Sequence, residues 1–177
     1  MNRAIITGID IRPDRVVCLI AHELEIVNQG TFLQLIGHGI TEFPIDCTDP
    51  LQYSDEELEK YIRQSIDKAE TESNESVKDA YVSIYDNNES IYIDQEIELG
   101  NEIVSDKVIN LFFKQEEFKS LYSEIKEPLH SFPISHKINN SKSVSDPIGL
   151  KVNNLKTRWH IIMTDSDRLN KLRNIFE

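Results

Sequence analysis

Residue types that define specialised classes of protein are scarce in this sequence. Its 177 residues include two cysteines, Cys18 and Cys47, with no CxxC or Cys/His spacing, which excludes a disulfide framework, a zinc ribbon and a redox pair. No apolar run reaches the roughly 18 residues that a membrane-spanning helix needs. The N-terminus has one arginine but turns to Gly8 and Asp10 before a signal-peptide core can form. We therefore expect a cytoplasmic protein.

Basic residues are also few, and they do not cluster. Lysine and arginine number 19 against 31 aspartates and glutamates, which gives a formal net charge of -12. Such a charge repels a phosphate backbone, so nucleic acid is excluded as a partner. Apolar residues are sufficient at 39%, which allows one ordinary domain or two small ones.

The first third of the chain is typical of strands followed by a helix. Ile5–Asp10 and Val16–Ala21 flank a turn at residues 12–14, and Phe32–Ile40 follows a second turn signal, Asn28-Gln29-Gly30, so we expect a three-stranded meander. Ser54–Glu57 is a capping box, and apolar residues then recur at helical spacing. We expect this helix to end within the polar stretch Glu70–Ser76, which we take as the first domain boundary.

A second group of elements follows that boundary. Residues 80–85 and 91–99 alternate in polarity across Asn87-Asn88, which predicts a pair of strands. Ser105 precedes a helical pattern that carries Val108 and Phe112 and continues as far as Ile125. The last elements are two strands and a helix, predicted at Leu129–Ile138, at Leu155–Met163 and after Asp165.

Four blocks of sequence, in this order, are similar to one known family. They are Thr7–Ile11 with Val16–Ala21, then Leu35–Gly39, then Leu129–Ile134, and finally Asp146–Leu150 leading into Trp159–Thr164. Their order and spacing resemble the N-terminal part of the bacterial cell division protein FtsA, of the actin-like ATPase superfamily, in its alphaproteobacterial form.

The resemblance implies an α/β (α+β) fold. The family places residues 1–76 in the first part of an actin-like (ribonuclease H-like) subdomain and 77–163 in an inserted strand-helix-strand-strand interaction domain. Residues 164–177 return to the first subdomain. Family members continue into a second lobe with an adenosine pocket and a membrane-binding helix, which we do not expect in these residues.

The resemblance also identifies a candidate nucleotide site. The family's first phosphate loop has the pattern Gly-Xaa-Asp-Xaa-Gly followed by hydroxyl residues and lysine. Gly8 and Asp10 match this pattern, and Arg15 keeps the positive charge. Residues 12–14, Arg-Pro-Asp, do not match, because they add bulk, remove a backbone donor and add a repelling charge. We therefore interpret the loop as a hairpin turn and expect no enzyme activity and no cofactor, although complete family members bind ATP and Mg²⁺.

No other constellation predicts catalysis or metal binding. His130 and His136 lie on one predicted strand, where even spacing places both on one face. No cysteine or carboxylate at ligand spacing completes a metal site, and Ser131 and Ser135 lack the strained turn of a nucleophile. We predict neither a metal nor a catalytic residue.

The tyrosines of the inserted domain indicate an interaction edge. Tyr81, Tyr85 and Tyr92 lie on predicted strands whose edge can receive another chain. In FtsA-like proteins this domain contacts other division proteins and itself, so the resemblance implies division proteins and a homodimer as partners. The acidic stretch Asp55–Glu75 is interpreted as a solvated helix face, or as a surface that attracts a basic partner.

Three functions are compatible with these observations. The leading hypothesis is a division scaffold or interaction module located at the division site through its partners. The first alternative is an actin-like ATPase completed by a second lobe in trans, and the second is a pilus-assembly adaptor of the same superfamily. The altered phosphate loop argues against the ATPase. The residues of the blocks that begin at Leu129 and Asp146 favour a division protein over a pilus-assembly adaptor.

Overall fold

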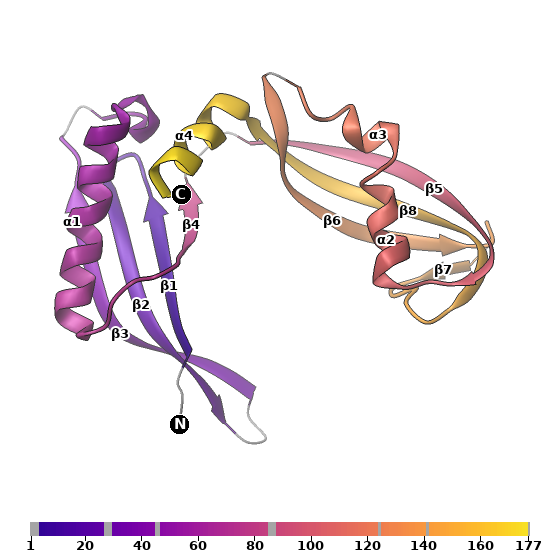
Figure 1. Cartoon of the computed structure of the whole chain (residues 1–177), viewed down its shortest axis with the longest axis horizontal. Coiled ribbons are helices and arrows are strands. Elements are labelled where there is room, and N and C mark those ends of the chain that lie inside the picture. The colour runs from indigo at the N-terminus through magenta and orange to yellow at the C-terminus, as the bar shows by residue number, and fades with distance from the viewer. Residues whose placement is uncertain are drawn as a thin grey trace. The chain divides into compact units, whose positions relative to one another are not determined.

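The computed structural model describes residues 4–26, 30–44, 47–84, 88–123, 125–140 and 142–176. The chain is mixed α/β and divides into two compact units, residues 1–86 with 171–177 and residues 87–170. Each unit contains one four-stranded sheet, and the described residues form four α-helices (Figure 1). Within these residues, no helix is long and apolar enough to cross a membrane.

The sheet of the first unit has the strand order β3-β2-β1-β4. Its strands are β1 (Ala4–Ile11), β2 (Arg15–Ile26), β3 (Gly30–Glu42) and β4 (Tyr81–Ile84). Antiparallel pairing of β1 with β2 and of β2 with β3 confirms the predicted meander. The predicted turn residues Asn28 and Gln29 lie outside the described residues.

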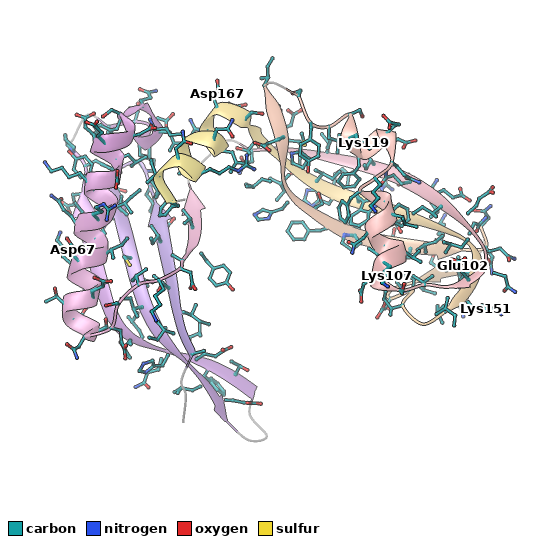
Figure 2. All side chains as sticks on the ribbon, in the orientation of Figure 1. Asp67, Glu102, Lys107, Lys119, Lys151 and Asp167 are labelled. Carbon is teal, nitrogen blue, oxygen red and sulfur yellow. The ribbon has the colours of Figure 1, made fainter. Side chains whose placement is uncertain are left out.

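Helix α1 (Asp55–Ser73) covers one face of this sheet, and a short 3₁₀ helix, η1 (Pro50–Gln52), precedes it (Figure 1). The capping box is present, because the Ser54 side chain accepts from the Glu57 backbone N–H while the Glu57 carboxylate accepts from that of Ser54. Leu58 and Ile62 are buried against the sheet, whereas Asp67 lies on the outer side of the helix (Figure 2).

The helix ends where the sequence predicted. We expected its end within the polar stretch Glu70–Ser76, and its last residue is Ser73. The polar residues of this last turn have partners: the Glu70 carboxylate accepts a hydrogen bond of 2.7 Å from the Val77 backbone, and Glu72 lies 2.5 Å from His38 Nδ1. These contacts stabilise a turn that buries no apolar residue beyond Ala69.

Two glycines allow α1 to approach β3 closely. A Cβ atom at Gly39 would lie 1.8 Å from the Ser65 carbonyl oxygen, and one at Gly37 would lie 2.4 Å from the Ala69 carbonyl oxygen. The helix contributes the small residues Ser65 and Ala69 at these points, and both are fully buried. The helix backbone therefore packs directly on the strand backbone.

Strand β4 corrects two predictions. We expected it to pair with the strand at residues 91–99 inside the second domain, but it pairs in parallel with β1. The first unit consequently runs to residue 86 rather than 76 and resumes at Lys171 rather than 164. Alternating polarity indicates a strand but not its partner, because pairing is decided by distant residues. Tyr85 and Asn87, which belonged to this prediction, lie outside the described residues.

The sheet of the second unit has the order β5-β8-β6-β7. Its elements are β5 (Glu89–Ile103), α2 (Asp106–Phe112), α3 (Glu116–Lys119), β6 (Lys126–Ile138), β7 (Lys142–Val144) and β8 (Lys151–Asp165), followed by α4 (Ser166–Phe176). The predicted strand-helix-strand-strand order is confirmed, with the short β7 in addition.

The sequence predicted one helix between β5 and β6, but the structure has two short ones, α2 and α3. Phe112 of α2 and Phe118 of α3 both pack edge-on against Trp159, with ring centroids 5.7 Å away in each case. A turn between the helices brings both rings onto this side chain, and all three are buried. Tyr122 and Ile125, which we expected on the same helix, are exposed instead.

The two histidines of β6 lie on opposite faces, so the prediction that they share a face is wrong. His130 pairs with Ile162 and is exposed, whereas His136 pairs with Thr157 and is buried. The register shifts between Pro133 and Ser135, and a shift of one residue exchanges the two faces of a strand.

Substitution of Gly39 tests the close helix–strand contact. We expect Gly39→Ala to lower the free energy of unfolding by at least about 2 kcal/mol, because the added methyl group overlaps backbone atoms that cannot move independently. Gly8→Ala is the matched control, since a Cβ at Gly8 meets no atom within 4 Å. Urea denaturation followed by circular dichroism measures both. Equal stability of the two variants would contradict the proposed packing.

Burial of His136 predicts a pH dependence of stability. Burial lowers the pKa of His136 below its usual 6.5, and the charge of Asp146 opposes this shift. The folded chain therefore holds the neutral ring, and the stability this contributes is complete above about pH 6.5 and is lost as the pH falls and the unfolded chain takes up a proton.

The variant His136→Gln isolates this effect, because glutamine can still reach Thr157 Oγ1, 2.9 Å from the histidine Nδ1, but does not titrate. Between about pH 7 and pH 5.5, the free energy of unfolding should fall more steeply for the wild-type chain than for the variant. Parallel pH profiles would show that His136 does not titrate as described.

Candidate functional site

The predicted phosphate-loop residues border a groove on the sheet face that α1 leaves uncovered. The groove holds about 500 Å³ and is lined by Gly8, Ile9, Asp10, Arg12, Arg15, Val17, Leu19, Tyr81 and Ser83. Gly8, Asp10 and Arg15, the three residues selected from sequence, thus come together at one place. Their role in nucleotide binding stays a prediction.

The charged side chains of the β1–β2 hairpin pair with one another. Arg12 Nε donates to Asp10 Oδ2 at 2.5 Å, and the Arg15 guanidinium donates to Asp14 Oδ2 at 2.8 and 2.5 Å. The hydrogen bond from Arg15 holds the pKa of Asp14 below its usual value, and Asp14 in turn raises the pKa of Arg15. The two cations are therefore neutralised within the hairpin instead of facing the groove as free charges.

The backbone of the hairpin offers few donors to a phosphate. The Arg12 N–H donates to the Arg15 carbonyl at 2.9 Å and closes the turn, while Pro13 has no N–H. The Asp14 carbonyl accepts from the Phe43 N–H at 2.8 Å, which ties the turn to the end of β3. A phosphate loop needs several convergent free N–H groups, and at Arg12 and Pro13 this turn does not offer one.

Two residues of the groove were missed by the sequence reasoning. Tyr81 and Ser83 of β4 lie beside Gly8 and Asp10 in the parallel β1–β4 register. We had assigned β4 to the other domain, so no local signal could place these side chains here. Tyr81 is 77% exposed, and its place beside Gly8 means that it lines a groove of the first unit and not an edge of the second.

The other candidate positions are dispersed. Cys18 is buried, and burial raises the pKa of its thiol to about 11, which makes it unreactive. Among the described residues, no group of three or more histidines, cysteines or carboxylates is arranged to hold a metal ion. Tyr92 of β5 is exposed on the sheet of the second unit, beside His160.

The fold is consistent with one class of protein. In it, a meander is joined by a parallel fourth strand, interrupted after that strand by a second unit and completed by a C-terminal helix segment, and this layout fits a partial actin-like subdomain with an insertion.

A comparison with curated proteins then gives a particular relative. The chain is 26% identical over 167 residues to the cell division protein FtsA of Buchnera aphidicola subsp. Schizaphis graminum (strain Sg), a match that covers 91% of this chain. The resemblance to FtsA inferred from the sequence blocks is thereby confirmed. The chain spans 37% of the length of that relative. No protein-family model matches it.

The internal ion pairs of the hairpin lead to a testable prediction. Asp14→Asn leaves the Arg15 guanidinium without its carboxylate, so in titrations that extend to millimolar Mg-ATP we expect this variant to bind roughly threefold more tightly than the weakly binding control at low ionic strength. The control is Asp67→Asn, which makes the same charge change on the outer side of α1 (Figure 2). Calorimetric titration measures both affinities, and identical titrations would contradict neutralisation of Arg15 by Asp14.

Proposed function

We propose that this chain is a cytoplasmic, division-associated interaction module of FtsA type that acts through protein contacts and not through ATP hydrolysis. The observation that carries the division role is the match to a division protein across both units of the chain. The partners are other division proteins, contacted through the second unit, and these contacts would bring the chain to the division site.

The chemistry of the hairpin supports a role without hydrolysis. Its cations are paired with its own carboxylates, the Arg12 N–H is used to close the turn, and Pro13 has no N–H. The groove beside it favours a second candidate, a nucleotide-binding ATPase completed in trans, because its volume of about 500 Å³ is adequate for a small ligand. The match to a division protein supports division over the pilus-assembly alternative.

Self-association is part of the proposal. Leu19 and Ile40 are more than 40% exposed on the uncovered face of the first sheet, and Tyr81 lies on the same face. Apolar side chains gathered on one sheet face are typical of a surface that a partner covers, and a second copy of the chain would supply one.

Localisation and nucleotide titration together test the proposed function. A fluorescent fusion of the chain should concentrate at the division septum of dividing cells, whereas the fluorescent protein alone should stay diffuse. Calorimetric titration of the wild-type chain with Mg-ATP should give no saturable binding in the micromolar range.

The division role and the absence of ATP hydrolysis would be contradicted by different results. A diffuse fusion would contradict the division role, whatever the nucleotide result. Saturable micromolar binding of Mg-ATP, with release of phosphate, would replace the interaction module by the ATPase completed in trans.

A further inference from the structure

The sheet of the second unit has one face covered by α2 and α3, and its other face, on which the described residues form no helix, is here named the open face (Figure 1). The register of β5, β8 and β6 places Tyr92, His160 and Phe132 at directly opposite positions on this face. The Tyr92 and His160 rings stack at 4.9 Å, and the Phe132 and His160 rings lie 6.4 Å apart. Tyr92 is 58% exposed and Phe132 48%, so the row is an aromatic surface that solvent reaches.

A small basic pocket adjoins this aromatic row. It holds about 100 Å³ and is lined by Asp94, Ser135, Lys137, Lys156 and Arg158. Asp94 is its single carboxylate and is shared, lying 3.4 Å from the Lys156 ammonium and 3.5 Å from Arg158 Nε. Among the described residues, Lys137 has no carboxylate partner. The pocket thus has three cations for one anion in a chain of net charge -12.

The strand register makes this surplus of positive charge unfavourable without a ligand. Lys137 and Lys156 are directly opposite each other in the β6–β8 pair. Like charges at such positions repel and destabilise the sheet, because their Cβ atoms are only about 5 Å apart. Glu96 lies opposite Lys156 on β5 but outside the pocket lining. An anion in the pocket would relieve the repulsion between the two lysines.

We propose that the open face binds an acidic segment of a partner protein, with a carboxylate in the basic pocket and an apolar side chain on the aromatic row. Charge complementarity identifies the occupant, since the pocket is the size of one small acidic group and carries unpaired positive charge. Arg158 and His160 are two residues apart on β8, which is a separation of about 6.6 Å. Side chains two positions apart in an extended peptide have this spacing, so the segment would have an acidic residue, any residue, then an apolar one.

This inference deepens the proposed interaction role and rests on it, because it specifies the partner chemistry that the second unit recognises. A short fluorescein-labelled peptide in which aspartate and leucine alternate with serine tests it by fluorescence anisotropy. The same peptide with asparagine in place of aspartate, and labelled oligothymidylate, are the comparison probes. The wild-type chain should bind the aspartate peptide most tightly, and more weakly as salt is added.

Two variants of the open face, each with a matched control, locate the site. Lys137→Glu should weaken binding of the aspartate peptide roughly tenfold, whereas Lys107→Glu, the same charge change on α2, should leave it within about twofold (Figure 2). Phe132→Ala should weaken it by roughly fivefold, with exposed Tyr122→Ala as control. Because these side chains are exposed, circular dichroism should show that all four variants fold.

The results that would contradict the acidic-segment site differ from those that would contradict the division role. Equal binding of the aspartate and asparagine peptides, equal effects of Lys137→Glu and Lys107→Glu, or tighter binding of oligothymidylate would each overturn this inference. In that case a septal fluorescent fusion would still support the proposed function. A diffuse fusion with intact peptide binding would contradict the division role and leave the acidic-segment site standing.

Discussion

The direct contact between the backbones of α1 and β3 is the constraint on which the first unit depends. Gly37 and Gly39 remove the Cβ atoms that would separate helix from strand, and the buried Ser65 hydroxyl donates to the Val16 carbonyl of the neighbouring strand β2 at 3.1 Å. This contact decides which face of the sheet is buried. Among the described residues of the first unit, no helix covers the opposite face, and the groove at Gly8 lies there.

Each unit packs helices against one face of its sheet, but the residues at the contact differ. The first buries a helix against glycines, and the second buries two short helices against Trp159, whose ring contacts three phenylalanines. In each unit one sheet face carries the core and the other carries the candidate site. The hairpin of the first unit has its charges paired internally, while the pocket at Lys137 has a positive charge in excess. The second unit is therefore the one equipped to attract a charged partner.

Local sequence signals predicted most elements but not their partners. The capping box at Ser54, the turn at residues 12–14 and the alternation around Tyr92 each depend on neighbouring residues, and each structure formed where predicted. The parallel pairing of β4 depends on β1, seventy-odd positions earlier, and the register shift in β6 depends on its neighbour in the sheet. The residues of the basic pocket come from three strands far apart in the chain, so no local pattern could bring them together.

The insertion of the second unit has a consequence for how the chain folds. Leu172 and Ile175 pack on the core of the first unit, so that core is completed by residues made after the entire second unit. Closing a contact across a long flexible loop has an entropic cost that rises with loop length. In the folded second unit, however, Glu89 and Met163 are paired neighbours on β5 and β8, so the two ends of the insertion already meet. Early folding of the second unit would therefore bring the ends of the insertion together and shorten the loop that the first unit has to close. This lower entropic cost favours folding of the inserted second unit before the first unit, which it interrupts.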